Sequence, residues 1–451
     1  MQQEKKHKSD EQSRRETPAV SVRLPDGTLA ELIYRSEERK TLFVLARGGD
    51  TWEAERIELP NGRILRPYSA ENNLITHKAI LLPSEAAEYQ AVPLLAAEVR
   101  GFIHRYVDLP PAFEEVACHY VLFSWRYDDF PELAYLRVLG DFGSGKSRFL
   151  TTVGSLVYRP IFASGASTVS PLFRILDAVG GTLVLDEGDF RFSDEKAEIV
   201  KILNNGNARG FPVLRTDTTP SGEFNPRAFR VYGPKLLATR HYFEDPALES
   251  RCITCAMGKT GLRSDLPITL PPEFEEEALR LRNKLLMYRL REAGQLRVPE
   301  ASTLRPLEPR IAQVFSSLLA SVDDERGRER LLAFARLASD ELRSLRSDSI
   351  EADVVAAVVA LKGTSGSIAV KAVARALMEA DGSAVLSPRA VGSILRRLGF
   401  SPRKRQGNYV LVPEEMKHLA VLVRRYGVMS PESTSQVDIG DIGDVGQDDL
   451  S

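Results

Sequence analysis

The sequence is poor in cysteine and has no long hydrophobic run. It contains three cysteines among 451 residues, Cys118, Cys252 and Cys255, and this number does not form an even disulfide framework. Such sparse cysteine is typical of a reducing compartment. No apolar run approaches the roughly 20 residues that cross a bilayer, and residues 1–17 lack the apolar segment of a secretory signal. We therefore expect a cytoplasmic protein without a membrane partner.

An excess of charge of either sign is also absent. The chain has 60 Lys and Arg against 62 Asp and Glu, a net charge of −2, so the overall balance gives no argument for a nucleic-acid partner. Any such site has to come from local basic clusters. The length exceeds that of one ordinary domain, and about two to four domains are expected.

The most informative stretch that is present is Gly140-Asp141-Phe142-Gly143-Ser144-Gly145-Lys146-Ser147, which has the G-x-x-x-x-G-K-S pattern of a phosphate-binding loop. It lies between an apolar run, 133–139, and an amphipathic segment, 148–157, as a loop between strand and helix requires. Backbone N–H groups and the helix N-terminus would surround the phosphates. Lys146 would neutralise phosphate charge and Ser147 would complete a Mg²⁺ shell. The sequence therefore predicts a site for ATP and Mg²⁺ rather than a chance glycine-rich turn.

A second apolar strand, 182–187, ends in the adjacent acids Asp186 and Glu187. A buried strand has little reason to end in paired carboxylates unless they meet a cation or a reacting group. We expect Asp186 to hold the magnesium and Glu187 to polarise the attacking water. A strand that simply exits to solvent is the alternative, and the phosphate loop upstream argues against it.

The remaining core alternates strands and helices, which favours a parallel α/β sheet with crossover helices. Strands are expected at 160–163, 234–239 and 252–257, and helices at 170–179 and 193–203. Cys252 and Cys255 lie three apart on a strand and so face opposite sides. We interpret them as ordinary apolar residues rather than half of a zinc site.

Residues 206–232 interrupt this alternation with two short strands around a Thr-Pro-Ser-Gly turn, which predicts a hairpin. Four arginines give it basic character: Arg209, Arg215, Arg227 and Arg230. Two interpretations remain open, a solvated surface hairpin and a loop that points into a nucleic-acid channel. Under the second, Arg215 and Arg227 are candidate DNA contacts.

Polar residues near the ends of the next strands are further candidates for catalysis. Thr239 ends the strand 234–239 and would orient the lytic water. Arg251 follows a short helix, lies too far from its own phosphates for easy contact, and would reach those of a neighbouring subunit as an arginine finger. A structural ion pair is the alternative for Arg251. Either Arg282 or Arg310, in the helical stretch 271–361, would be a second nucleotide-sensing arginine.

The C-terminal region predicts a winged helix-turn-helix. One helix is expected over 368–379, and a second begins at Ser387-Pro388, which have N-cap and N1 chemistry. A basic turn over 401–408 and a strand over 409–412 would form the wing. The candidate DNA contacts here are Arg397, Arg403, Lys404 and Arg405. Such domains also serve as protein-interaction modules, so both partners stay open.

Composition and pattern divide the chain into six segments. These are a disordered leader (1–17), a β-rich N-terminal domain (18–84), a helical lead-in with the ATPase core (85–262), a helical lid or linker (263–362), a winged-helix domain (363–428) and a disordered acidic tail (429–451).

Gly140–Ser147, 183–187, the inserted hairpin and Ala247-Leu248-Glu249-Ser250-Arg251 together resemble the AAA+ ATPases of the helicase clade. The likeness is to minichromosome-maintenance-type and superfamily 3 replicative helicases and to AAA+ proteins of mobile elements. It implies a P-loop AAA+ core and the roles of Walker A for Lys146 and Ser147, Walker B for Asp186 and Glu187, sensor 1 for Thr239 and finger for Arg251. Sensor 1 is commonly Asn in these helicases, so Thr239 departs from the pattern. The N-terminal region also lacks the zinc-binding cysteines of the minichromosome-maintenance proteins.

The resemblance implies a hexameric ATP hydrolase that acts on DNA, as a replicative helicase of a mobile genetic element. Two alternatives stay open. The chain would be an AAA+ loader or adaptor whose ATP state gates assembly without unwinding, or a non-catalytic DNA-binding regulator with a vestigial nucleotide fold. The intact Lys146, Asp186 and Glu187 argue against the last.

Overall fold

The computed structural model describes residues 16–164, 169–186, 194–216, 225–243, 245–258, 263–295, 299–322, 324–347, 349–362, 367–381, 386–405 and 407–428. The chain divides into two compact units, Met1–Ala335 and Arg336–Ser451. No helix in the described segments is long and apolar enough to cross a membrane.

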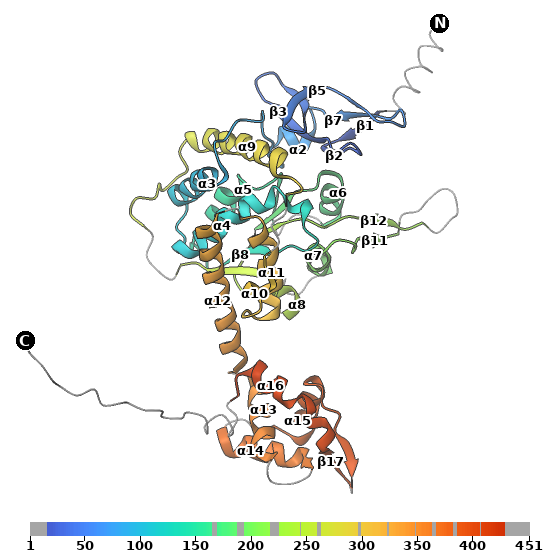
Figure 1. Ribbon diagram of the computed structural model, residues 1–451, viewed down its shortest axis with the longest axis vertical. Helices are drawn as coiled ribbons and strands as arrows, with labels where there is room; N and C mark the ends of the chain where they lie inside the picture. The colour runs from blue at the N-terminus through green and yellow to red at the C-terminus, as the bar shows by residue number, and fades with distance from the viewer. Residues whose placement is uncertain are drawn as a thin grey trace, which may run out of the picture. The chain divides into compact units, whose positions relative to one another are not determined.

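The N-terminal part of the first unit is rich in strands, as the turn signals in the sequence predict. The strands are β1 (Glu16–Ala19), β2 (Ser21–Arg23), β3 (Leu29–Arg35), β4 (Lys40–Arg47), β5 (Asp50–Ala54), β6 (Ile57–Glu58) and β7 (Ile64–Pro67). They form a four-stranded antiparallel sheet in the order β2-β3-β4-β5 and a three-stranded sheet in the order β1-β7-β6 (Figure 1). A short helix, α2 (Asn73–Thr76), follows.

A buried charge cluster ties this sheet to the rest of the unit. Glu31 on β3 accepts from Tyr158 Oη at 2.8 Å and from Arg289 Nε at 2.7 Å, and it also pairs with Arg159. Arg289 pairs in turn with Asp128 at 2.6 Å. Burial opposes ionisation of Glu31, yet the two arginine charges outweigh it and lower the pKa of its carboxyl. The cluster therefore fixes the N-terminal sheet against the core.

Helices lead from this sheet into the core. These are α3 (Val92–Tyr106), α4 (Pro111–Ser124), a 3₁₀ turn (Tyr127–Asp129) and, later in the chain, α9 (Glu273–Glu292). Prolines at the first turns of α3 and α4 suit positions where a backbone N–H has no partner in the helix. Helix α4 is buried over most of its surface, because it lies between the sheet and neighbouring helices.

The core is a five-stranded parallel sheet, which confirms the predicted α/β class. Its strands are β8 (Tyr135–Leu139), β9 (Pro160–Ser164), β10 (Thr182–Asp186), β13 (Lys235–Thr239) and β14 (Cys252–Ala256), in the order β14-β8-β13-β10-β9. The central strands are continuous apolar runs because both faces of a parallel sheet are covered by helices. Strands β8 and β10 thus lie on either side of β13, and the carboxyl ends of all three strands lie at the same end of the sheet.

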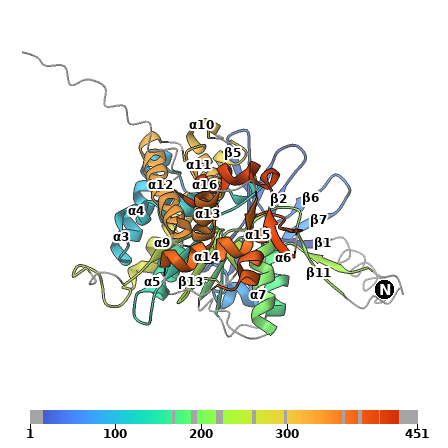
Figure 2. The same ribbon diagram turned by 90° about the horizontal axis from the view of Figure 1, so that it is seen from below.

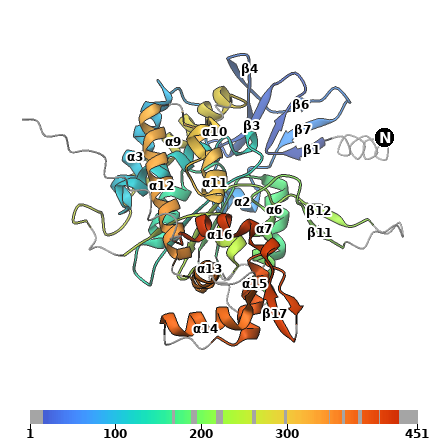
Figure 3. The same ribbon diagram turned by 60° about the horizontal axis from the view of Figure 1, so that its bottom comes forward.

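Crossover helices and the inserted hairpin complete the core. The helices are α5 (Lys146–Gly154), α6 (Val169–Val179), α7 (Asp194–Asn205) and α8 (Pro246–Glu249). Strands β11 (Val213–Arg215) and β12 (Arg227–Phe229) pair antiparallel, as predicted for 206–232. They extend beyond α6 and α7 in all three views (Figure 1, Figure 2, Figure 3).

The helical stretch after the core contains α10 (Ala301–Leu304), α11 (Pro309–Ala320) and α12 (Glu325–Ser347). Helix α12 crosses from the first compact unit into the second. The predicted helical character of 271–361 is therefore confirmed where the structure describes it.

The second unit contains α13 (Ile350–Leu361), β15 (Ile368–Ala369), α14 (Val370–Asp381), α15 (Pro388–Arg397), β16 (Arg403–Arg405), β17 (Asn408–Leu411), a 3₁₀ helix (Pro413–His418) and α16 (Leu419–Tyr426). The strands form a small antiparallel sheet in the order β15-β17-β16. The helix predicted from 368 begins only at Val370, because Ile368 and Ala369 pair with β17. Ser387 caps α15 by accepting from Ala390 N at 3.2 Å, as its sequence position predicts.

Candidate nucleotide-binding site

The glycine-rich loop joins the end of β8 to the start of α5. Gly143 and Gly145 have φ of 72° and 92°, values that side-chain-bearing residues rarely adopt. At Gly140 an added Cβ would lie 2.7 Å from Ser144 Oγ and 3.1 Å from the Met257 carbonyl oxygen. These contacts explain why the tight turn requires glycine. Because the loop follows the carboxyl end of β8, the N-terminus of α5 also lies at that end of the sheet.

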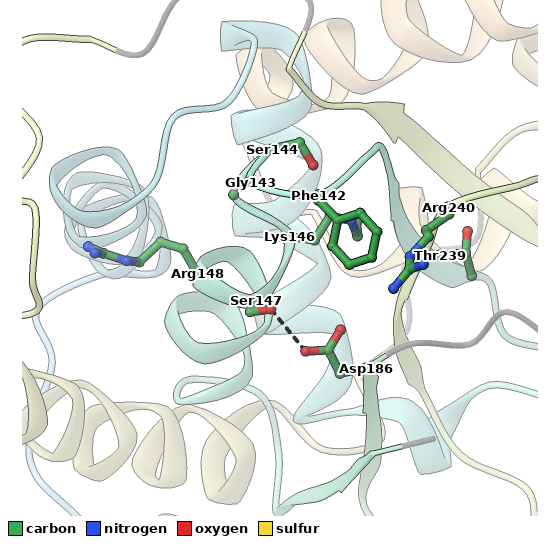
Figure 4. Close-up of a pocket in the computed structure, with 10 residues that line it drawn as sticks. Phe142, Gly143, Ser144, Lys146, Ser147, Arg148, Asp186, Thr239 and Arg240 are labelled. Carbon is green, nitrogen blue, oxygen red and sulfur yellow. Dashed lines mark hydrogen bonds between the residues drawn. The ribbon is translucent and has the colours of Figure 1, made fainter. Parts of the chain in front are cut away.

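The loop borders a cavity of about 320 Å³. Its lining residues are Phe142, Gly143, Ser144, Gly145, Lys146, Ser147, Arg148, Asp186, Thr239 and Arg240. Lys146 Nζ donates to the carbonyl oxygens of Gly140 and Asp141, both at 2.7 Å. The loop, Lys146, Ser147, Asp186 and Thr239 were each predicted for one site, and the fold brings them together (Figure 4).

Ser147 Oγ donates to Asp186 Oδ2 at 3.0 Å (Figure 4). Ser147 is the second residue of α5 and Asp186 ends β10, so the fold brings a hydroxyl and a carboxylate oxygen together beside Lys146. Mg²⁺ prefers oxygen ligands, is commonly held by one or two protein groups, and takes its other ligands from water and phosphate. The two side chains therefore fit the predicted cofactor. In the described segments no group of three or more His, Cys, Asp or Glu could hold a metal by itself.

Thr239 carries a buried hydroxyl at the end of β13. It is 1% exposed, and Oγ1 has no hydrogen-bond partner among the described residues. Its backbone carbonyl accepts from Gly140 N at 3.2 Å, which ties the strand end to the phosphate loop. A buried, unsatisfied hydroxyl is costly unless something else bonds it. Its position on the cavity wall is compatible with the predicted role in orienting water.

Sequence reasoning missed Arg240, the residue after Thr239. Its guanidinium carbon lies 3.7 Å from the centroid of the Phe142 ring, and Phe142 is 78% exposed (Figure 4). The signal that was available is the arginine placed directly after a polar strand end in a nucleotide-binding core.

Glu187, the predicted catalytic base, lies outside the described residues. The description of β10 ends at Asp186. Its assignment therefore stays a prediction from its position next to Asp186.

Arg251 lies at the amino-terminal end of the parallel strands, whereas this cavity lies at their carboxyl end. It precedes β14, whose first residue is in register with Tyr135 at the start of β8, whereas the phosphate loop follows the end of β8. A five-residue strand spans about 16 Å, so this guanidinium does not line its own site. It donates to Asn204 Oδ1 at 2.7 Å, and its Nε has no partner among the described atoms.

The structure also separates the two lid arginines. Arg310 Nε donates to Ser250 Oγ at 3.1 Å, and its pKa is lowered by burial and by the nearby charge of Arg251. Arg282 is buried, donates to the Ser155 carbonyl oxygen at 2.8 Å, and has its pKa lowered to about 10 by burial. Arg310 therefore joins Arg251 in one basic cluster, and Arg282 has a structural partner.

The hairpin arginines engage acids and rings at the hairpin base. Arg215 pairs with Glu198 and lies 4.2 Å over the Phe173 ring. Arg227 is 3.8 Å from Asp177. These contacts anchor the base of the hairpin to α6 and α7. Its turn, 217–224, lies outside the described residues.

The C-terminal candidates lie on the surface of the second unit. Arg403, Lys404 and Arg405 form β16 and are all exposed. Arg397 is also exposed and pairs with Glu351 at 3.0 Å. Tyr409 on β17 is 50% exposed, and the centroid of its ring lies 6.0 Å from the guanidinium carbon of Arg396.

The two cysteines of the strand β14 were predicted to be ordinary apolar residues. Cys255 is buried and Cys252 is half-buried. Burial raises the pKa of the Cys252 thiol to about 12, which keeps it protonated at neutral pH.

No protein-family model and no curated protein matches the chain. One similar solved structure is an active helicase, Cch of SCCmec type IV, with 11% identity and a TM-score of 0.40 over 90% of this chain and 80% of that chain. A second is the NrS-1 C-terminal region, with 10% identity and a TM-score of 0.36 over 85% of this chain and 96% of that chain. A third is a full-length MCM homolog from Methanopyrus kandleri, with 13% identity and a TM-score of 0.34 over 69% of this chain and 74% of that chain. In the motifs of its phosphate loop and strand ends, the sequence resembles AAA+ ATPases of the helicase clade.

Proposed function

We propose that this chain is a ring-forming ATPase that uses ATP hydrolysis to move DNA. The observation that carries the proposal is the hydrogen bond between Ser147 and Asp186 next to Lys146 at the phosphate loop. This is the arrangement that binding of a magnesium nucleotide requires. A vestigial fold would have no need to keep all three groups in place.

Each residue of the site has a chemical task in this proposal. Lys146 and the loop N–H groups bind and orient the phosphates, and Ser147 and Asp186 hold Mg²⁺. The bound Mg²⁺ supplies charge neutralisation for the transferred phosphoryl group. Glu187 accepts a proton from the attacking water, and the Thr239 hydroxyl orients that water. Thr239 suits this task because its buried hydroxyl has no other partner among the described residues.

Hydrolysis in this proposal requires a second copy of the chain. Arg251 and Arg310 lie together at the edge of the sheet away from their own cavity, so they serve a neighbouring subunit. A head-to-tail contact of this kind forms a closed ring when the rotation between neighbouring subunits, repeated from copy to copy, returns to the first subunit. We propose a hexamer with Arg251 as the finger and Arg310 as the sensing arginine, both acting in trans.

Two surfaces would contact DNA. The order of helices and strands in the second unit, with a basic β16–β17 pair, supports a winged helix whose wing is Arg403–Arg405. The β11–β12 hairpin extends from the core and would reach a strand in the ring channel (Figure 1). The finer proposal is a replicative-type helicase of a mobile genetic element.

A specific observation favours the alternative of a loader or adaptor. Arg215 and Arg227 at the hairpin base are held by Glu198 and Asp177, so the described part of the hairpin offers fewer free cations than its sequence suggests. A loader would hydrolyse ATP without separating strands.

Strand displacement from a forked duplex distinguishes the two functions. The motor predicts ATP-dependent displacement that Lys146→Ala abolishes. ATP hydrolysis without displacement would favour the loader, and absence of ATP binding would contradict both.

A further inference from the structure

Asn204 lies in the last turn of α7 and contacts the residue proposed as the arginine finger. Its Oδ1 accepts from Arg251 Nη1 at 2.7 Å, and its Nδ2 donates to Asp245 Oδ2 at 2.9 Å. The acceptor end of the amide therefore faces a cationic donor, and the donor end faces a carboxylate. Hydrogen bonds with a charged partner are roughly twice as strong as neutral ones. One neutral side chain thus holds Arg251 against the end of α7.

The carboxylate that orients Asn204 is itself held by the helix that leads to Arg251. Asp245 Oδ1 accepts from Ala247 N at 2.9 Å, in the first turn of α8. The hydrogen bond from Asn204 is the largest cause that lowers the pKa of the Asp245 carboxyl, so this group is ionised at neutral pH. Asp245 precedes α8 and Arg251 follows it. The amide of Asn204 therefore joins both ends of this short helix to α7.

The backbone on both sides of this contact is tied to the central sheet by one residue. Tyr135, the first residue of β8, donates from its N–H to the Arg251 carbonyl oxygen at 2.9 Å. Its hydroxyl donates to the carbonyl oxygen of Leu203, the neighbour of Asn204, at 2.6 Å. The backbone of Arg251 and the end of α7 are therefore already restrained. What Asn204 adds is a restraint on the direction of the guanidinium.

An amide at this position restrains Arg251 without neutralising its charge. A guanidinium has five N–H donors, and Asn204 accepts from Nη1. Nε of Arg251 is buried and has no hydrogen-bond partner among the described atoms. A carboxylate in place of the amide would pair with the guanidinium and compete with a phosphate for it. The residue type at position 204 therefore suits an arginine that is oriented in advance and keeps its charge for another partner.

We propose that Asn204 is a positioning residue, which orients Arg251 toward the nucleotide bound by the neighbouring subunit. This inference rests on the proposed function, in which Arg251 acts in trans. Because α7 follows the strand that ends in Asp186 and precedes the hairpin 206–232, Asn204 connects the finger to two elements of its own subunit that serve nucleotide and DNA in that proposal. A misplacement of about 1 Å can cost about 100-fold in rate. Loss of this restraint therefore lowers turnover and leaves the nucleotide site in place.

ATP turnover and nucleotide affinity of Asn204→Ala are the first test. Turnover should fall by at least about tenfold, because the finger is present but no longer directed. The Kd for Mg²⁺–ATPγS should change by less than about twofold, because a finger acts mainly on the transition state. A rise in Kd as large as the fall in turnover would overturn the inference.

Asn205→Ala is the matched control, since it truncates the same side chain at the next position of α7. The Asn205 amide donates to the Lys201 carbonyl oxygen at 2.9 Å within the same helix. This variant should keep the wild-type turnover. An equal loss in the two variants would overturn the inference, because it would show that α7 as a whole is disturbed.

Mixing Asn204→Ala chains with two inactive variants shows at which site Asn204 acts. An equal mixture with Glu187→Gln chains should reach at least about a quarter of the wild-type rate, because about that fraction of interfaces joins an intact Glu187 to an intact finger. An equal mixture with Arg251→Ala chains should give only the mean of the two separate rates, because both variants are defective on the same side of the interface.

The opposite pattern, with recovery beside Arg251→Ala and none beside Glu187→Gln, would place the effect of Asn204 in its own subunit's site and overturn the inference. Recovery in neither mixture would show a general loss of structure and overturn it as well. Arg251→Ala mixed with Glu187→Gln tests the proposed function separately. If those two variants do not recover activity together, the shared site itself fails.

Discussion

Thr239 allows the hydrolytic role of the site to be tested with little disturbance of the fold. Thr239→Val keeps the side-chain shape and removes a buried hydroxyl that has no partner among the described residues. We predict a fall in ATP turnover of about 100-fold, the size of effect seen when one preorganised polar group is lost, with little change in ATP affinity. Stability should not fall, because replacing an unsatisfied buried hydroxyl by an apolar group is neutral or stabilising.

A matched threonine is available on the neighbouring strand. Thr182 begins β10, is fully buried, and its Oγ1 also has no partner among the described atoms. Thr182→Val should leave turnover unchanged, since it lies at the other end of the strand from Asp186. If both variants reduce turnover equally, the specific role of Thr239 is wrong. ATPase rates and melting temperatures of the two variants are the measurements.

Lys235 gives a prediction about pH at the same scale. It begins β13, is fully buried, donates to the carbonyl oxygens of Val231 and Gly233, and has its pKa lowered by burial to about 7. The unfolded lysine titrates near 10.5. Between pH 7 and 10.5 the Lys235 amine is protonated in the unfolded chain and neutral in the folded chain, so the free energy of unfolding rises with pH. Below the lower value the cost of burying the charged amine is fully present.

Lys235→Met removes this dependence. The free energy of unfolding of the wild type relative to the variant should increase between pH 7.5 and 9, by at most about 2 kcal/mol. Denaturant unfolding of both proteins at the two pH values measures it. Parallel stability profiles would show that Lys235 stays protonated in the folded chain.

At the scale of elements, β16 tests the proposed DNA contact. Replacing Arg403, Lys404 and Arg405 by Ala should weaken DNA binding and reduce the slope of log affinity against log salt by up to about 3, since each phosphate contact releases counterions. ATP hydrolysis without DNA should not change, because β16 belongs to the second unit. Affinity measured at several salt concentrations gives the slope.

The control removes the same charge from another element of the same unit. Lys417, Arg424 and Arg425 lie on the 3₁₀ helix and on α16, and all are exposed. An equal loss of slope in that triple variant would indicate a diffuse basic surface rather than a wing.

Elements of the core could be predicted because their signals are local. The run Thr182–Asp186 has apolar residues on both faces and ends in an acid, and Ser387 with Pro388 marks the start of α15. The strand β15 was missed because two residues are too few to show the alternation of apolar and polar side chains that marks a strand. Only their pairing with β17 defines it.

The pairing of side chains across the fold was beyond sequence reasoning. The anchoring of Arg215 by Glu198 and of Arg227 by Asp177 depends on how the hairpin lies against α6 and α7. The stack of Arg240 on Phe142 likewise depends on the strand order, which places β13 beside β8. The choice of Arg310 over Arg282 required their burial and partners.

At the scale of the whole molecule, the proposed role of Arg251 as a finger implies sites shared between subunits. Arg251→Ala and Glu187→Gln chains should each be inactive alone. Mixed in equal amounts, they should recover about a quarter of the wild-type rate, because a random ring pairs an intact Glu187 with an intact Arg251 at that fraction of interfaces. ATPase rates across mixing ratios measure the recovery, and no recovery at any ratio would contradict action in trans.

The central claim, an ATP-hydrolysing DNA motor, is tested most directly by the ATPase rate with and without single-stranded DNA, on protein whose assembly is sized in ATP. The account predicts a six-fold assembly whose hydrolysis is stimulated by DNA and abolished in Lys146→Ala, since that residue belongs to the phosphate loop. A monomer that hydrolyses ATP at the same rate with and without DNA would contradict it.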